Sequence, residues 1–551
     1  MSPDPPQMRW WGWGDPRRGP ELSASALQLM REHVGIATRP RPPVALSAVR
    51  LAPSRLREQT ADALRGIVGV EGVRADSRER ILHAAGKGYA DLVRMRAGAP
   101  QAAPDAVVLP ASHAHVRAVL ELCAESSLAL IPFGGGTSVV GGVEPLRGPH
   151  QAAIALDMRR LAEITELDRE SRIVTVGAGM RAAALERQLA RAGLTLGHWP
   201  QSFQYVSLGG CVATRSAGQA SSGYGGIAKM VLGLRLAAPA GDIELPAMPA
   251  SAAGPGLREL LIGSEGALGV IDQVSLRLRA APGERIFEGS LFETFASGLA
   301  ALRTLAQEHA LPEVVRLSDV RETWLSLKLA GSAGLKARLG RAYVGLRGYG
   351  ETAAGRCLAI FGCEGSGEEL HARRRRARAI ARAHGALALG RSPGEAWRRG
   401  RFEGPYLRDE LLTLGVIVET LETATRWANV EHLHSAALAA IERALVAQGT
   451  PGIVMCHVSH VYETGASLYF TYIARQREGA EIAQWQAVKQ AASDAIIAGG
   501  GTITHHHAVG RDHAPWLDRE LGREGLAALA ALKAQLDPAG IMNPGKLLAE
   551  D

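Results

Sequence analysis

The stretch IPFGGGTSVVGG, residues 131–142, places three consecutive glycines directly after an apolar run and directly before a Thr-Ser pair. Three adjacent glycines cost backbone entropy, so the loop must need φ angles, or a closeness of approach, that a Cβ atom would block. A phosphate group is the first ligand to consider, because bare backbone N–H groups form concave anion-binding sites. Residues 106–110 and 129–133 read as buried strands around a helical segment, 111–128. The sequence therefore predicts a βαβ unit that carries the glycine loop at a strand end.

Three further loops rich in glycine and hydroxyl residues follow, at residues 173–180, 200–225 and 261–271. The first loop alone is weak evidence, because it matches neither the Walker pattern nor a GxGxxG fingerprint in its proper place. Each of the four loops lies at the edge of a predicted strand and offers backbone N–H groups and small hydroxyls. One long ligand that contacts several loops explains the set better than four separate turns.

Length and composition predict a compact α/β-type globular protein of two or more domains, with 551 residues, 46% hydrophobic residues and 64 glycines. Residues 1–100 form a polar, helical N-terminal region, and 101–281 contain the glycine loops. Residues 282–500 alternate helices and strands, which predicts an antiparallel sheet covered by helices. Residues 501–551 are expected to return to the glycine-loop domain.

Charge and cysteine usage exclude some classes of partner. Lys and Arg total 62 against 55 for Asp and Glu, so the net charge of +7 suits anionic small molecules or a membrane surface. Nucleic acid would need a concentrated basic patch with interleaved aromatics, so we expect no nucleic-acid partner. The arginine-rich segment 371–384 is interpreted as the solvated face of a helix between two strands. Five cysteines without a CxxC pair, and no signal-peptide pattern, indicate a cytoplasmic protein.

The order of IPFGGGTS, PQSFQYVSLGGCVATRSAGQASSGYG and GSEGALGVI resembles the flavin domain of the vanillyl-alcohol-oxidase superfamily, also called the FAD-binding PCMH-type domain. The resemblance implies an α+β fold: a two-lobed FAD-binding domain and an α+β cap domain that carries an antiparallel sheet. The residues implied to hold FAD are Pro132, Phe133, Gly134, Gly135, Gly136, Thr137, Ser138, Gln201, Ser202, Phe203, Gln204, Tyr205, Val206, Ser207, Thr214, Arg215, Ser216, Ala217, Ser264, Glu265, Gly266, Ala267, Leu268, Gly269 and Val270.

The second half narrows the resemblance. The segments MRWWGWGDP, VIVETLETATRW, YETGASLYFTY, THHHAVG and IMNPGKLL together resemble the alkyldihydroxyacetonephosphate synthase family, over nearly the whole chain from residue 8 to residue 548. The implied activity exchanges the acyl group of acyl-dihydroxyacetone phosphate for a fatty alcohol on an FAD enzyme, with no net redox change. Gln201 departs from the family, in which an aspartate is usual at this position.

His505, His506 and His507 form the most specific piece of the resemblance. On a strand, three consecutive histidines would point to alternate faces, and one or two could simply be solvated. The resemblance implies that they carry protons or donate to phosphate near the flavin. We expect no metal, because neighbouring histidines cannot easily share one tetrahedral ion and no carboxylate or thiolate partner is evident.

The resemblance implies roles for three more residues. Tyr469 matches the family's proton donor and acceptor, although from the residues alone a core tyrosine is the simpler interpretation. A phenol acts as a base only if cationic or hydrogen-bonding neighbours lower its pKa, and the histidines are candidates. Arg408 matches the residue that holds the substrate phosphate, and Arg316 one that is needed near the flavin. The alternative for each arginine is an ion pair with a nearby acid, Asp409 or Asp319.

Two apolar stretches have open interpretations. Residues 411–421 are a candidate lining for a tunnel that accepts long-chain substrates, although ordinary core packing explains them equally well. Trp10, Trp11 and Trp13 would either dip into a membrane interface or pack on the body of the protein.

Two rivals to the synthase activity remain at this point: an FAD-dependent oxidase or dehydrogenase of a 2-hydroxy acid, and a non-catalytic flavin-binding protein. The flavin loop has no histidine or cysteine for a covalent link, so non-covalent FAD is expected. The LLAED terminus carries no peroxisomal signal, which favours a cytoplasmic enzyme, with peripheral contact to a membrane as a further expectation. A homodimer is implied by the resemblance alone.

Overall fold

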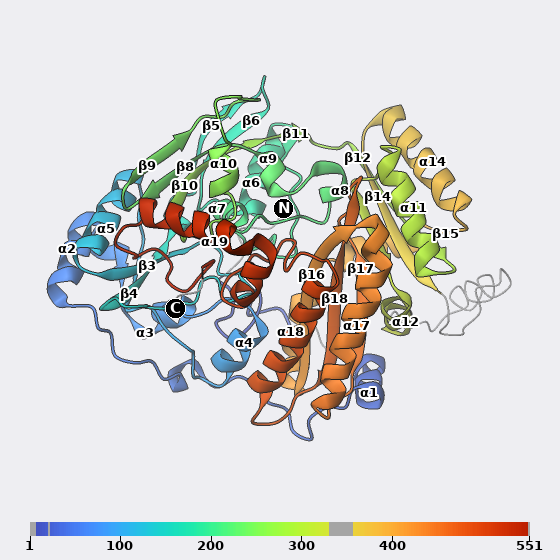
Figure 1. Ribbon diagram of the computed structural model, residues 1–551, viewed down its shortest axis with the longest axis horizontal. Coiled ribbons are helices and arrows are strands. Elements are labelled where there is room, and N and C mark those ends of the chain that lie inside the picture. Colours follow the sequence, from blue (N-terminus) through green and yellow to red (C-terminus); the bar gives the residue numbers. More distant parts are fainter. Residues whose placement is uncertain (1–6, 20–21, 330–355, 549–551) are drawn as a thin grey trace.

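The computed structural model describes residues 7–19, 22–329 and 356–548, and its first and second halves lie side by side (Figure 1). The first half contains a four-stranded and a five-stranded sheet, and the second half contains one seven-stranded sheet. This is the mixed helix and sheet fold that the sequence predicts, with a separate antiparallel sheet in the second half. The predicted segment boundaries at residues 100, 281 and 500 stay predictions.

The four-stranded sheet carries the glycine loop. Its strand order is β1 (Val73–Arg74), β2 (Ala106–Val108), β4 (Ala152–Asp157) and β3 (Leu128–Phe133). Strands β2, β4 and β3 are parallel, and α5 (His113–Glu125) connects β2 to β3 as the predicted βαβ unit requires. Every residue of β2 and β4 is buried, which explains why these strands read as continuous apolar runs.

The five-stranded sheet is antiparallel, in the order β5 (Ile164–Asp168), β6 (Ile173–Gly177), β10 (Val270–Arg277), β8 (Val231–Ala238) and β9 (Gly241–Leu245). Helix α6 (Ala182–Arg191) follows β6 and buries Leu185 and Leu189 in the core of this lobe. Helix α7 (Leu208–Ala213) begins at Ser207, whose hydroxyl accepts the N–H of Gly210 and so caps the helix.

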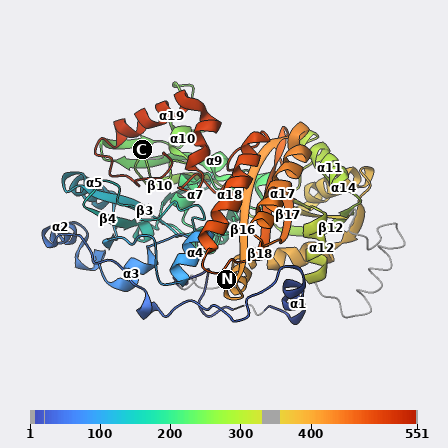
Figure 2. The same ribbon diagram turned by 60° about the horizontal axis from the view of Figure 1, so that its bottom comes forward.

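We call the seven-stranded sheet the cap sheet. Its order is β15 (Leu387–Gly390), β12 (Glu284–Phe292), β14 (Cys357–Gly365), β13 (Val314–Ser318), β17 (Ile453–Val458), β18 (Gly465–Arg475) and β16 (Val416–Arg426), with every neighbouring pair antiparallel. One face is covered by α11 (Phe295–Gln307), α14 (Gly367–Ala383), α17 (Val430–Ala447) and α18 (Glu481–Ala498), which share its apolar core. Figure 2 shows α17 and α18 lying next to each other over β16 and β18.

Helix α14 holds the arginine-rich segment, and the interpretation of a solvated face is only partly correct. Arg375 is exposed, with Glu368 as its partner. Arg374, in contrast, forms a bidentate pair with the mostly buried Glu288 of β12, through Nε at 2.9 Å and Nη2 at 2.6 Å. Part of the arginine run therefore docks the helix on the sheet through charge-assisted hydrogen bonds.

The N-terminal region is less helical than predicted. It contains α1 (Ala24–His33), α2 (Glu58–Val68), α3 (Ser77–Leu82) and α4 (Tyr89–Arg96), joined by irregular segments. Trp13 is buried and packs edge-on against Tyr205, so the first described residues lie against the body of the protein. The second interpretation of the tryptophans, packing on the body, is the correct one for Trp13. Among the described residues, no helix is both long and apolar enough to cross a membrane.

The C-terminal residues join the glycine-loop lobe. Helix α19 (Leu517–Leu536) packs Leu532 and Leu536 against the core of the five-stranded lobe. Residues beyond it pair with the edge of β3, where Leu130 donates to the carbonyl of Ile541 at 2.8 Å and accepts the N–H of Asn543 at 2.9 Å. The last described segment thus becomes an extra partner of the strand that carries the glycine loop.

The remaining short elements connect these layers. They are β7 (Leu194–Thr195), β11 (Arg279–Ala280), α8 (Ser221–Tyr224), α9 (Ile227–Met230), α10 (Leu257–Leu261), α12 (Val320–Leu329), α15 (Arg391–Gly400), α16 (Gly404–Thr413) and the 3₁₀ turns η1 (Leu46–Ala48), η2 (Val70–Gly72), η3 (Met158–Arg160), η4 (Trp427–Asn429) and η5 (Ala514–Trp516).

Candidate active site

One cavity of about 470 Å³ lies between the glycine loops and the face of the cap sheet opposite α11, α14, α17 and α18. Its walls combine backbone from residues 132–139 with side chains of the cap sheet, among them Arg316 and Tyr469. Its size is within the usual range for a small-molecule or cofactor site. Residues that are far apart in the sequence therefore face one shared space.

Two of the three glycines of the first loop are required by contacts with the loop at residues 200–225. A Cβ atom on Gly135 would collide with the backbone carbonyl of Tyr205, and one on Gly134 would collide with the hydroxyl of Ser207. Gly136 has a φ of +64°, a conformation that residues with a Cβ atom rarely adopt. The loop is bare because two loops share this corner, which leaves main-chain N–H groups facing the cavity. This cradle of backbone fits a dinucleotide diphosphate, as the resemblance implied.

Most of the predicted FAD-binding residues line the cavity. They are Pro132, Phe133, Gly134, Gly135, Gly136, Thr137, Ser138, Gln201, Ser202, Val206, Ser207, Thr214, Ser216, Ala217, Glu265, Gly266 and Gly269.

The other predicted residues do not line the cavity, and their contact with the cofactor stays a prediction. Phe203 stacks on Phe402, Gln204 accepts from the hydroxyl of Tyr406, and Arg215 pairs with Glu259 at the surface. The rest are buried in the lobes: Tyr205, Ser264, Ala267, Leu268 and Val270.

Tyr469 projects from β18 into the cavity, while its neighbour Phe470 packs in the core under the helices. The alternation of a strand produces this division. The Tyr469 ring stacks on His457, with 4.8 Å between ring centroids, and lies 6.0 Å from the ring of His506. The core interpretation of Tyr469 is thus wrong. Burial raises the pKa of Tyr469 to about 12 and outweighs Thr420 and Arg316, which lower the pKa, so the condition for Tyr469 to act as a base is not met in this structure.

Arg316 lines the cavity from β13, and its partner differs from the predicted one. Its Nη2 donates to Glu322 at 2.7 Å and lies 3.0 Å from Nδ1 of His457, whereas the alternative interpretation named Asp319. Burial favours the protonated form of Glu322, but Arg316 and His457 outweigh it and lower the pKa. Asp319 instead accepts the backbone N–H groups of Glu322 and Cys456.

Arg408 reaches the cavity from α16. Its Nη1 donates to the carbonyl of Lys87 at 2.8 Å, and its Nη2 lies 3.7 Å from Asp409. Within the described residues, Nε and Nη2 of Arg408 are buried and have no hydrogen-bond partner. A buried guanidinium with free donors, facing a cavity, is suited to bind an anion there.

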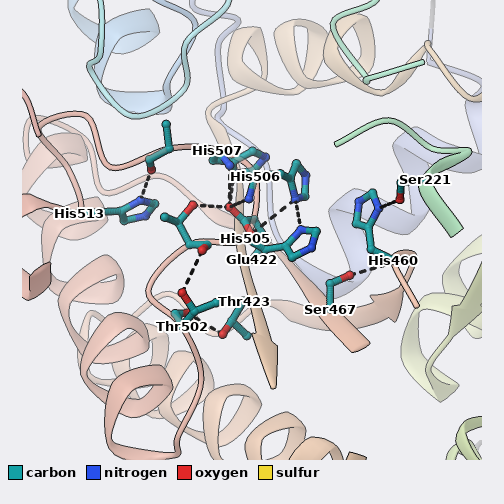
Figure 3. A network of polar contacts seen from close by, with 12 residues as sticks. Ser221, Glu422, Thr423, His460, Ser467, Thr502, His505, His506, His507 and His513 are labelled. Atoms are coloured by element: carbon teal, nitrogen blue, oxygen red, sulfur yellow. Dashed lines mark hydrogen bonds and ion pairs between the residues drawn. The ribbon is translucent and has the colours of Figure 1, made fainter. Parts of the chain in front are cut away.

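The histidine triplet lies in a loop and not on a strand, and one buried carboxylate organises it. Glu422 of β16, 2% exposed, accepts the backbone N–H groups of His505, His506 (3.1 Å) and His507 (2.8 Å). It also accepts the hydroxyl of Thr504 at 2.6 Å. Figure 3 shows the loop wrapped around this side chain. The alternation expected of a strand is therefore absent, and the three imidazoles are gathered on one side of Glu422.

One more imidazole, of His460, and the phenol of Tyr462 join the cluster from the cap. His460 follows β17 and stacks on His505, with 4.8 Å between ring centroids. Its Nδ1 lies 2.5 Å from the hydroxyl of Ser221, in the loop at residues 200–225. His505 Nε2 lies 2.5 Å from the hydroxyl of Tyr462, and its Nδ1 lies 2.9 Å from Nδ1 of His506. Potential ligand atoms of His460, His505 and His506 lie within 4.8 Å of one another, so the fold adds a third imidazole to two of the triplet, although no carboxylate or thiolate belongs to this group among the described residues.

Burial controls the charge of this cluster. It lowers the pKa of His505 and of His506 to about 4, and it lowers the pKa of His507 and His460 as well. Burial alone would raise the pKa of Glu422, but the neighbouring His506, His507 and His505, together with the hydroxyl of Thr504, keep it well below its ordinary value. At neutral pH the cluster therefore consists of neutral imidazoles around one carboxylate.

The sequence argument missed Lys87, Ser221, Glu422, His457 and His460. The pair His457 and His460, spaced H-x-x-H in CHVSHVY, was a readable signal. Glu422 and Ser221 carried none, because a single acid on a strand or a serine in a polar loop is common and its role depends on contacts made across the fold.

Comparison with known proteins agrees with this geometry. The family described as "FAD binding domain" matches residues 104–245, and "FAD linked oxidases, C-terminal domain" matches residues 281–547. FAD is therefore the cofactor of this fold.

Named relatives cover almost the whole chain. An alkyldihydroxyacetonephosphate synthase of Dictyostelium discoideum is 32% identical over 98% of this chain and 93% of its own length. One of Trypanosoma brucei brucei is 32% identical over 91% and 82%. A solved alkyldihydroxyacetonephosphate synthase superposes with a TM-score of 0.85 at 29% identity, covering 98% of this chain and 99% of the other. The chain therefore belongs to the alkyldihydroxyacetonephosphate synthase family.

Proposed function

We propose that this enzyme exchanges the acyl group of acyl-dihydroxyacetone phosphate for a long-chain alcohol and so forms an ether-lipid precursor. The observation that carries the proposal is the cavity itself, where a backbone cradle for FAD faces Tyr469, the histidine cluster and the free donors of Arg408. In the exchange, the bond between C1 and the ester oxygen breaks, the fatty acid leaves, and the oxygen of the alcohol bonds to C1.

The glycine loops hold the cofactor. Residues 134–138 and Ser207 would bind the diphosphate through main-chain N–H groups and hydroxyls, and Gln201, Thr214 and residue 266 would line the rest of FAD. When bound, FAD supplies an electron-rich ring that activates C1 without a net change of redox state. Non-covalent binding is part of the proposal.

Tyr469 and the imidazoles move protons near C1. A phenol whose pKa is about 12 is protonated at neutral pH, so Tyr469 begins as a proton donor. The neutral imidazole of His506, stacked on Tyr469, is positioned to accept a proton in the return step. His457, stacked on the other side and hydrogen-bonded to Glu322, orients the phenol ring.

Arg408 binds the phosphate group of the substrate. A guanidinium fork suits a phosphate dianion, and the buried donors Nε and Nη2 of Arg408 are available for it. The carbonyl of Lys87 and the carboxylate of Asp409 fix the remaining side of the fork. The substrate is thereby held at its charged end, which leaves C1 free to lie near the cofactor.

The setting in the cell is also proposed. We infer a cytoplasmic homodimer that takes its lipid substrates through peripheral contact with a membrane. Val418 and Thr420 of the predicted tunnel stretch line the cavity, whereas Ile417 and Leu421 belong to the core. The acyl and alkyl chains would therefore contact only part of that stretch.

The test uses purified protein loaded with FAD, acyl-dihydroxyacetone phosphate and a fatty alcohol, with no electron acceptor. We expect fatty acid release matched one to one by ether product. Absence of exchange, together with anaerobic bleaching of the flavin by phosphate-free 2-hydroxy acids, would instead assign the chain to the hydroxy-acid oxidases. A Tyr469→Phe variant that loses the exchange distinguishes catalysis from passive flavin binding.

A further inference from the structure

Lys87 is a buried lysine on the wall of the active-site cavity. It lies between two glycines, before α4, and is 6% exposed. Its Nζ donates to the carbonyl of Arg9 at 2.9 Å, which is the one hydrogen bond of that group among the described residues. An ammonium group has three donors. A buried lysine that uses one of them, beside a cavity, has donors available for a ligand.

Lys87 and Arg408 are joined through the backbone. Nη1 of Arg408 donates to the carbonyl oxygen of Lys87 at 2.8 Å, so the two cations lie against the same part of the cavity. Placing like charges together inside a protein is unfavourable unless an anion compensates them. The side chain of Arg408 leaves Nε and Nη2 without hydrogen-bond partners in the described structure, so both residues present unused donors.

The nearby carboxylates are already shared. Asp409 lies 3.9 Å from Arg9 and 3.7 Å from Arg408, and it accepts the backbone N–H of Trp13 at 2.5 Å. Burial lowers the pKa of Lys87 to about 8, with Asp409 opposing and Arg408 reinforcing this effect. Asp409 is shared among these cations, and burial raises the pKa of Asp91, the other carboxyl group near Lys87, to about 7, so that Asp91 is only partly charged at neutral pH. The pocket is therefore positive when it holds no ligand, which suits a phosphate dianion.

We propose that Lys87 and Arg408 form a two-cation site for the phosphate group of the substrate, in which Lys87 supplies the second charge. This inference rests on the proposed function for the identity of the substrate. The chemistry selects a phosphate monoester, because a dianion satisfies both cations whereas a single carboxylate would satisfy one. Lys87 also donates its backbone N–H to Ser138 at 2.6 Å, so the diphosphate of FAD is the competing ligand that an experiment must separate.

The decisive measurement is calorimetric titration of the FAD-loaded protein with glycerol 3-phosphate. Lys87→Met keeps the length of the side chain and removes its charge, and we expect the dissociation constant to rise about 10- to 100-fold, the effect of one charged hydrogen bond. Lys87→Arg should retain most of the affinity. Lys328→Met, at an exposed lysine of α12, is the matched control and should bind as the unchanged protein does.

Flavin content and the melting temperature of each variant are measured alongside. A Lys87→Met protein that keeps its FAD, its melting temperature and its affinity for glycerol 3-phosphate overturns the inference. Loss of FAD, with unchanged glycerol 3-phosphate affinity in the fraction that stays loaded, also overturns it, because Lys87 then serves the cofactor. If the unchanged protein binds glycerol 3-phosphate through Lys87 but exchanges no acyl group, the anion site stands and the proposed function fails.

The pH dependence of binding gives a second readout. Lys87 must be charged to bind a dianion, so affinity should fall as pH rises through about 8, and Lys87→Met should lose this decline. The charged groups that face Lys87 are Arg408 and Asp409 of α16, Asp91 of α4 and Arg9. Burial raises the pKa of Asp91 to about 7, so its titration overlaps that of Lys87, and only the part of the decline that Lys87→Met removes is assigned to Lys87. An identical decline in Lys87→Met would contradict the role of Lys87.

Discussion

The two walls of the cavity are built on opposite principles. The wall proposed to hold FAD consists of glycines and small hydroxyl residues that expose main chain to the cavity, as at residues 134–138. The opposite wall consists of large polar side chains on the cap sheet and its loops, where Tyr469 stacks on His506 and Arg316 contacts His457. Substitutions that add atoms should therefore impair the glycine-loop wall, whereas substitutions that remove polar atoms should impair the wall formed by the cap sheet.

The largest effect is expected from adding a methyl group to the first wall. In Gly135→Ala, the new Cβ would collide with the backbone of Tyr205 and Val206, which cannot rotate away. We expect the two loops to separate and the purified protein to lose nearly all of its FAD, as measured by its visible absorbance.

The matched control is Gly66→Ala in α2, where a Cβ meets open space. That variant should keep its FAD and should gain up to about 1 kcal/mol of stability, because alanine is the better helix former. A Gly135→Ala protein as yellow as the control would refute the account of the glycine loop.

Removing one oxygen from the second wall should have the next largest effect. Tyr469→Phe keeps the ring stacked on His457 but removes the proton donor, so turnover should fall about 10²- to 10⁴-fold. FAD binding should not change.

Tyr472→Phe is the control on the same strand, because Tyr472 belongs to the core under the helices and its hydroxyl has no partner among the described residues. Its turnover should stay within about twofold and its stability should be equal or higher, since an unpaired buried hydroxyl is unfavourable. Equal losses in the two variants would show that packing of β18, and not proton transfer, explains the result.

Glu422→Gln tests whether one carboxylate organises the triplet. An amide can accept through only one oxygen, so some donors of residues 504–507 would lose their partner. We expect a loss of about 1–3 kcal/mol in the free energy of unfolding, and turnover to fall more than FAD content. Urea unfolding and steady-state rates measure the two effects.

Glu520→Gln is the graded comparison. The exposed Glu520 of α19 accepts the hydroxyl of Thr502 and the N–H of Ile503, just before the triplet. The substitution should lower the free energy of unfolding by less than about 1 kcal/mol. If both substitutions act equally, burial of Glu422 does not matter to the triplet.

The smallest effect concerns pH and stability. The pKa of His505 and His506 is about 4 in the folded protein, below the ordinary value of 6.5, so the unfolded chain binds more protons between these values. Stability should therefore be unaffected above about pH 6.5 and should fall as pH is lowered from there toward 4. Thermal melting at pH 5 and 7 measures this difference, which should shrink in His505→Gln. An unchanged difference would mean that other buried histidines, such as His513, dominate it.

The same contrast explains what the sequence could predict. Main-chain binding leaves a pattern of adjacent glycines, so the loops at 134–138 and 264–270 were recognised from composition alone. Binding by side chains leaves only isolated residues in the sequence. Glu422 is one acidic residue on a strand, and its role becomes visible only when the loop at 504–507 folds around it. His505 and Ser221 likewise approach His460 across 45 and 239 positions of sequence, distances that no local pattern records.

The errors have the same origin. The triplet was considered as part of a strand, but its backbone N–H groups donate to Glu422 from a loop. The helix of arginines was assigned to solvent because charge alone was considered, whereas Glu288 on the neighbouring strand buries part of it. Local residue type predicted the element only for the arginine helix, and in both cases the partner supplied by the tertiary fold decided the role.

The pairing of Leu130 with Ile541 and Asn543 has a consequence for biosynthesis. During translation, the strand that carries the first glycine loop leaves the ribosome some four hundred residues before the segment that completes its edge. A nascent chain must therefore keep this edge unpaired until synthesis has almost finished. Chaperone dependence and late acquisition of colour are the expected signs of such an assembly order.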